Sequence, residues 1–198
     1  MNVLLAYIPY EIAVMLARRN FIHSKAIFFW PFVFIWLLFY PNAPYLITDF
    51  FHLSELPYKE IAYSLREGKR ISIFSSNYTI WMNFFHMILG VFLGITFGFV
   101  SLGIIGKLVR DRVKKLHPVI WISGVTLLSS YAIYIGRFQR LHSIELFVFP
   151  KRTLAQMMSA FKDIEFWPFF ALMTGVQIVL IFVWNRWIFA PYEEKQTV

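Results

Sequence analysis

The sequence predicts an all-α fold: a polytopic transmembrane bundle of about five membrane-spanning helices, with interfacial amphipathic helices on its outer face. Five stretches are apolar and almost free of charge: residues 3–17, 26–47, 78–106, 118–136 and 166–189. A bilayer core about 30 Å thick needs about 20 apolar residues in a helix. Lipid cannot satisfy bare backbone groups, so such stretches must be helical. The composition agrees, because 59% of the residues are hydrophobic and only 15% are charged, against about 25% in soluble domains.

The length and the net charge of the chain narrow the possible classes of protein further. We expect residues 1–198 to form one integral-membrane domain, because the chain leaves room for one helical bundle and little else. It contains no cysteine, which excludes disulfides and thiolate chemistry. The net charge of +8 is compatible with nucleic-acid binding, but its distribution indicates membrane orientation instead. We therefore expect the lipid bilayer, and no nucleic acid, as a partner.

Basic residues are concentrated in two short connections. Arg18, Arg19 and Lys25 separate the first two apolar stretches, and five Lys or Arg residues lie within 107–115, between the third and the fourth. The positive-inside rule assigns such connections to the cytoplasm, which places the N-terminus outside and the C-terminus inside. We expect the 107–117 segment to lie along the anionic inner leaflet as a topology signal. A specific lipid or nucleic-acid site there is the less favoured alternative.

The third stretch carries the clearest packing signal. Gly90, Gly94 and Gly98 recur every four residues, and such spacing lets another membrane helix approach to backbone contact. Asn83 and His86 precede them. Because polar groups are costly within lipid, we expect these two to make interhelical hydrogen bonds near the outer interface, with a buried proton path as the alternative.

The fourth and fifth apolar stretches contain only ordinary packing residues, but the segment between these two stretches is amphipathic. At helical spacing, one face of residues 151–164 is apolar while the cations lie off that face, which predicts an interfacial helix. The apolar face consists of Leu154, Met157, Met158, Phe161 and Ile164.

Two connections on the predicted outer side, near residues 48–77 and 137–165, hold more side-chain chemistry than a connection requires. The first follows Tyr40-Pro-Asn-Ala-Pro-Tyr45, whose two prolines predict the end of a helix and an extended turn. The second begins at Gly136-Arg137. We predict an outer-face binding cluster formed by Asn42, Tyr45, Asp49, His52, Arg137, Arg140, His142 and Glu145.

Two pairs in this cluster combine a carboxylate with an imidazole at helical spacing. They are Asp49 with His52, and His142 with Glu145. If the two connections met, these four side chains could bind a divalent metal such as zinc. Helix caps and ion pairs at the interface explain each pair separately, and we predict no metal, no cofactor and no catalytic residue.

These motifs resemble those of a bacterial membrane family, domain-of-unknown-function family 1361. The resemblance covers roughly residues 2–150. Residues 2–9 are similar to the family's early helix, and Trp36-Leu-Leu-Phe-Tyr-Pro-Asn-Ala-Pro-Tyr-Leu-Ile-Thr-Asp49 is similar to its signature. The glycine-bearing segment 94–102 and Gly136-Arg137-Phe with Arg140 resemble two further motifs.

The chain departs from the family pattern after Arg140. The pattern tends to Trp-Asn-Ser-Trp-Asp where this chain has Leu141-His-Ser-Ile-Glu145. Asparagine in place of His142 is a poor metal ligand, which weakens the metal hypothesis. The resemblance implies a multi-pass protein of the bacterial cytoplasmic (plasma) membrane and supplies no activity.

Three functions remain open. We favour a non-catalytic binding or assembly protein, because the forks of Arg137 and Arg140 suit phosphate or carboxylate groups. The outer cluster would then dock a partner protein or an anionic lipid-linked group. A small transporter, or a substrate-binding subunit of one, would instead use Glu11 and His86. An interfacial enzyme acting on lipid or cell-wall precursors would use the carboxylates and imidazoles of the cluster as acid, base or ligand.

Overall fold

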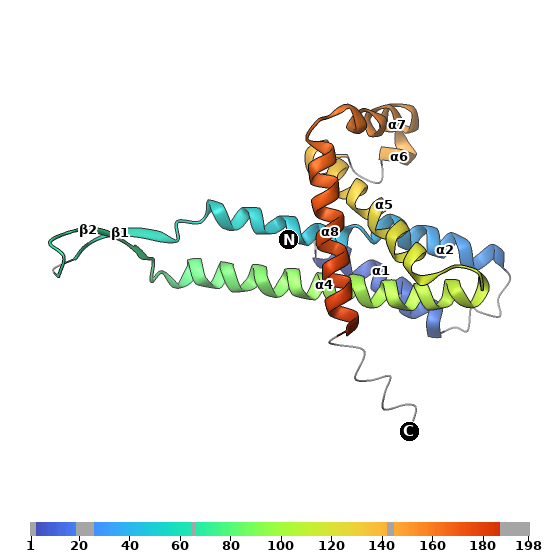
Figure 1. Cartoon of the computed structure of the whole chain (residues 1–198), viewed down its shortest axis with the longest axis horizontal. Coiled ribbons are helices and arrows are strands. Elements are labelled where there is room, and N and C mark those ends of the chain that lie inside the picture. Colours follow the sequence, from blue (N-terminus) through green and yellow to red (C-terminus); the bar gives the residue numbers. More distant parts are fainter. Residues whose placement is uncertain (1–2, 19–25, 65, 142–144, 187–198) are drawn as a thin grey trace, which may run out of the picture.

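A computed structural model describes residues 3–18, 26–64, 66–141 and 145–186 (Figure 1). Helices account for most of them, as the all-α prediction requires. In chain order the elements are α1 (Val3–Arg18), α2 (Ala26–Phe39), α3 (Asn42–Tyr45), the 3-10 helix η2 (Leu46–Glu55), β1 (Lys59–Ser64), β2 (Lys69–Phe74), α4 (Tyr78–Arg112), α5 (Pro118–Phe138), α6 (Glu145–Val148), α7 (Pro150–Ser159), η3 (Ala160–Lys162) and α8 (Phe166–Trp184).

In the described part of the chain, four helical segments are long and apolar enough to cross a membrane. They are Phe29–Glu55, Tyr78–Arg112, Pro118–Phe138 and Phe166–Trp184. The first of the five predicted stretches forms α1, whose 16 residues are fewer than the roughly 20 that a crossing needs. The all-α helical architecture is thus confirmed, with four segments of spanning length and a shorter helix packed against them.

A β-hairpin that we did not predict lies between two of these segments. Strands β1 and β2 pair antiparallel, with Lys59 opposite Phe74 and Ser64 opposite Lys69. Gly68 lies in the connecting turn at φ +62°, a conformation that glycine adopts at no steric cost. The hairpin extends beyond the ends of η2 and α4 (Figure 1), so it lengthens one end of the molecule without joining the helical core.

The core lies among α1, α2, α4 and α5, and Trp36 is its largest fully buried side chain. Its indole N–H donates to Ser101 Oγ of α4 at 3.1 Å, and its ring stacks on Trp121 of α5 with centroids 5.9 Å apart. Ser101 in turn donates to the Gly98 carbonyl at 2.7 Å. One residue of α2 therefore contacts both neighbouring helices, with its polar atom satisfied inside the core.

Two of the regularly spaced glycines lie at the closest helix approach. A Cβ atom built on Gly98 would lie 2.6 Å from Ala43 Cβ, and one on Gly94 would lie 2.1 Å from Leu46 Cδ1. Gly90 is also buried. The bare backbone of α4 at Gly98 thus allows α3 to pack so closely that a Cβ there would clash with Ala43, whereas at Gly94 the end of the Leu46 side chain fills the space.

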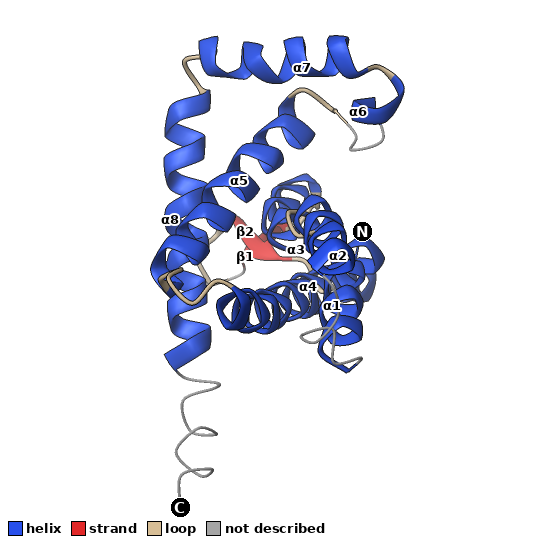
Figure 2. Cartoon of the chain, turned by 90° about the vertical axis from the view of Figure 1, so that its right-hand side faces the viewer, coloured by secondary structure: helices blue, strands red, loops and turns tan. Residues whose placement is uncertain are grey.

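α8 runs across α4 and packs mainly on α5 (Figure 1). Gln177 is completely buried, and its amide donates to Ser130 Oγ of α5 at 2.8 Å. Thr174 donates to the same oxygen at 2.9 Å. α7 lies across the ends of α5 and α8 (Figure 2). Its apolar face includes the exposed Met158, as an interfacial helix in contact with lipid requires.

The substitution Gly98→Ala should destabilise the protein, because Ala43 Cβ is rigid and the two helices must separate. Overpacking of this kind costs about 1–3 kcal/mol. We expect the apparent Tm in detergent to fall by at least about 3 °C. Gly175→Ala is the matched control, because nothing lies within 4 Å of its added methyl group; it should leave the apparent Tm unchanged or raise it. Equal shifts for the two variants would contradict the packing role of Gly98.

Candidate functional site

The proline-containing segment 40–45 positions one half of the candidate site. We expected an extended turn here, but Pro41 has helical angles of φ −58° and ψ −23°, and the helix continues into α3. Proline is tolerated in this conformation at the start of a helix, because the N–H that it lacks has no partner there. Asn42 donates its side-chain amide to the Phe39 carbonyl at 2.9 Å. Its observed contact thus secures the end of α2.

Three of the predicted cluster residues come together where η2 passes the end of α5. Arg137 Nη1 lies 3.8 Å from Asp49 Oδ1 and 3.5 Å from the Tyr45 hydroxyl. The guanidinium also lies 5.9 Å from the centre of the Tyr45 ring, within range of a cation–π contact. Only 22% of the Arg137 side chain and 13% of the Asp49 side chain are exposed. The two motifs therefore meet in a largely buried polar contact.

The other predicted residues lie apart from this contact. His52 is exposed, and its Nδ1 lies 3.5 Å from Glu55 Oε1. Arg140 is exposed and has a φ of +53°. Glu145 begins α6, and its carbonyl accepts from Thr153 Oγ1 at 3.0 Å. His142 lies outside the described residues.

The metal hypothesis gains no support from this arrangement. Asp49 faces Arg137, and the nearest acid to His52 is the exposed Glu55. Within the described ranges, no group of three or more His, Asp or Glu side chains is placed to hold a metal ion. Where the two motifs meet, Arg137 supplies a guanidinium, Asp49 a carboxylate and Tyr45 a phenol. These three groups are suited to binding a polar ligand.

An apolar cavity of about 260 Å³ lies between α2, α5 and α7, and Tyr45, Asp49 and Arg137 are not among its lining residues. The Tyr131 hydroxyl donates to the Met157 carbonyl at 2.9 Å, which holds α7 against α5 at the cavity wall. Sequence reasoning missed this cavity, although the apolar face of 151–164 was a signal for it. The lining residues are Leu37, Leu38, Pro41, Leu128, Tyr131, Ala132, Ile135, Leu141, Thr153 and Met157.

A second polar contact secures the junction between η3 and α8. Asp163 accepts a hydrogen bond from the Tyr134 hydroxyl and another from the Glu165 backbone N–H at 3.0 Å. These two hydrogen bonds hold the pKa of Asp163 below its ordinary value of 3.8, the bond from Tyr134 most strongly. The charged form also suits the start of α8, where the helix dipole favours an anion.

Together these features define a class: a helical membrane protein with a polar cluster at the meeting point of two motifs and an apolar cavity between α2, α5 and α7. The chain belongs to the family described as "Protein of unknown function (DUF1361)", which it matches over residues 1–180. This confirms the resemblance given by the sequence motifs. No curated protein and no solved structure matches the chain.

The Asp163 contact predicts a specific acid sensitivity. Because the folded pKa is lowered, the carboxylate stabilises the fold above about pH 3.8, the ordinary value, and this contribution is lost as the pH falls through the folded pKa. Asp163→Asn should therefore lower the apparent Tm at pH 7, and the difference from the wild type should shrink below about pH 4.

The apparent Tm should be measured in detergent from pH 3 to pH 7. Tyr134→Phe is the companion variant, because it removes the strongest hydrogen bond and should reduce the same pH-dependent difference. A gap between the wild type and Asp163→Asn that stays constant down to pH 3 would contradict this role.

Proposed function

We propose that this protein is a non-catalytic binding protein of the membrane whose outer cluster holds an anionic lipid-linked group. In this proposal Arg137 and Arg140 bind the anionic head, and the cavity between α2, α5 and α7 receives the apolar part. Two observations support it: the convergence of Arg137 on Tyr45 and Asp49, and an apolar cavity whose lining includes Ile135 and Leu141, on either side of Arg137 and Arg140 along the chain.

The geometry of Arg137 leaves capacity for a ligand. Hydrogen bonds from nitrogen to oxygen are usually 2.7–3.2 Å long, whereas its contacts with Tyr45 and Asp49 measure 3.5 and 3.8 Å. A guanidinium carries five N–H donors, so these two long contacts orient the group without saturating it. Phosphate and carboxylate groups match its planar fork.

The position of Arg140 also supports a role in binding. It lies three residues after Arg137, is exposed, and has a φ of +53°. A non-glycine residue in this region costs free energy and is frequent at ligand-binding sites. The chain bends there from α5 toward α6 and α7, between Ile135 and Leu141, which both line the cavity. The two arginines therefore lie in the chain between two residues that line the cavity.

The alternatives fit the structure less well. A transporter needs a polar path through the core, but the core is filled by side chains such as Phe29, Trp36 and Phe99. His86 is exposed on α4, and Glu11 accepts a hydrogen bond from Tyr7 at an exposed face of α1. An interfacial enzyme needs an acid or base free to act, whereas Asp49 faces Arg137.

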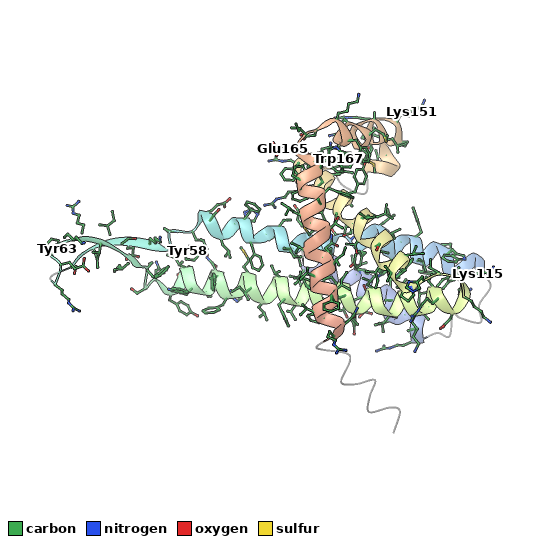
Figure 3. All side chains as sticks on the ribbon, viewed as in Figure 1. Tyr58, Tyr63, Lys115, Lys151, Glu165 and Trp167 are labelled. Carbon is green, nitrogen blue, oxygen red and sulfur yellow. The ribbon has the colours of Figure 1, made fainter. Side chains whose placement is uncertain are left out.

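We further propose that the chain lies in the bacterial cytoplasmic membrane as a multi-pass protein, with the N-terminus outside and the C-terminus inside. The end of α1, the start of α2 and the end of α4 lie at one end of the molecule (Figure 1), and Arg112 lies 4.0 Å above the ring of Phe29 there. Lys115 marks this basic end, and Tyr63 on the hairpin marks the opposite one (Figure 3).

Cysteine labelling tests the orientation cleanly, because the chain has no native cysteine. Ser72→Cys on the hairpin should react with a membrane-impermeant maleimide in intact cells. Lys115→Cys should react only after the membrane is permeabilised. Reaction of both, or the reverse pattern, would contradict the proposed orientation.

The binding proposal predicts that Arg137→Gln combined with Arg140→Gln will weaken retention of anionic lipid. Losing a charge-assisted hydrogen bond costs about 1.5–3 kcal/mol, so we expect at least a tenfold loss, as about 1.4 kcal/mol corresponds to a factor of ten. The measurement is native mass spectrometry of protein released from nanodiscs that contain phosphatidylglycerol and phosphatidylethanolamine.

The matched control is Lys69→Gln with Arg70→Gln, which removes two cations from the hairpin without touching the cluster. A third variant, Met157→Trp, fills the cavity and keeps both arginines; it should also reduce lipid retention. Retention equal to that of the control in both test variants would refute the proposal, and a crosslinked protein partner at the cluster would favour a docking role instead.

A further inference from the structure

We infer that a second, separate binding site for an anionic phospholipid lies at the opposite, basic end of the molecule. It occupies a cavity of about 170 Å³ between α4, the start of α5 and the end of α8. The lining residues are Phe99, Leu102, Gly103, Gly106, Lys107, Arg110, Pro118, Trp121, Ile122, Ile181 and Asn185.

The cavity lies where the apolar part of α4 gives way to its charged end. Phe99 and Leu102 line one part of it, while Lys107 and Arg110 line another. The two cations are three residues apart, so they lie on one face of the helix. A phospholipid has the same division, with an anionic phosphate above an apolar chain. Basic pockets between membrane helices on the cytoplasmic side suit such head groups.

A buried hydrogen-bond donor lines the same cavity. Trp121 Nε1 is shielded from solvent and has no hydrogen-bond partner among the residues that the structure describes. The indole can only donate, and its nitrogen packs against Gly106, because a Cβ there would lie 3.0 Å from it.

The start of α5 adds positive potential to the site. Pro118 is the first residue of this 21-residue helix and lines the cavity. Pro118 has no N–H, and the His117 side chain accepts from the Val119 N–H at 3.3 Å, so what the helix start contributes is its dipole, which favours an anion. Two cations of α4 and the start of α5 thus line one cavity. This convergence distinguishes a built site from the general attraction of a basic surface to the inner leaflet.

Removing the cavity cations should release the lipid. We expect Lys107→Gln with Arg110→Gln to reduce retention of phosphatidylglycerol at least tenfold in native mass spectrometry, since each charge-assisted hydrogen bond contributes about a factor of ten.

The matched control is Lys114→Gln with Lys115→Gln, which removes the same charge from the same basic segment outside the cavity. Equal losses in the two double variants would overturn the proposal, because they would show attraction to the segment's overall charge. Binding of inorganic phosphate alone, without lipid retention, would overturn the lipid assignment. Arg137→Gln with Arg140→Gln leaves this cavity intact, so the two sites succeed or fail independently.

Discussion

The close approach of α4 to the α3–η2 segment is the contact on which the rest of the structure depends. In lipid the hydrophobic effect does not drive helices together, so association rests on close packing and on hydrogen bonds. Gly94 and Gly98 supply the packing because Leu46 and Ala43 occupy the space where their side chains would be. This contact fixes the depth of η2 beside α4. It thereby places Tyr45 and Asp49 at the level where α5 ends and Arg137 can reach both.

Hydrophobicity along the chain was sufficient to predict the helices, and proline, glycine and charge were sufficient to locate the motifs. The hairpin could not be predicted from hydrophobicity in the same way, because its segment is short and rich in charge. The alternation of Ile61, Tyr63, Ile71 and Ile73, which is typical of strands, was its only signal. We predicted that Arg137 and Asp49 belong to one cluster, but not that their side chains contact each other. Residues 88 positions apart approach each other because of how α5 crosses the long α2–α3–η2 segment, and that crossing depends on side-chain shape. The apolar cavity likewise depends on where α7 folds back, which the amphipathic pattern of 151–164 does not specify.

The two cavities differ in the chemistry of the side chains around them. Each cavity has an apolar wall. The basic groups associated with the two cavities differ in how far neighbouring side chains fix their orientation. In the proposed function, Arg137 is oriented by Tyr45 and Asp49 and would select a ligand by geometry. In the second proposal, Lys107 and Arg110 line a cavity beside a helix start and would select a ligand by charge.

The attachment of α8 shows why the basic-end cavity matters for the fold. Of the four segments of spanning length in the described part, α8 is the least buried, and its buried residues form a narrow face that includes Met173, Gln177 and Ile181. Its link to α5 combines two hydrogen bonds to a single serine oxygen, from Gln177 and Thr174, with the packing of Phe166 and Phe169 on Tyr134. Its other end reaches the cavity through Ile181 and Asn185. A phospholipid bound there would contact α4, α5 and α8 at once, and so would add packing at that end of α8.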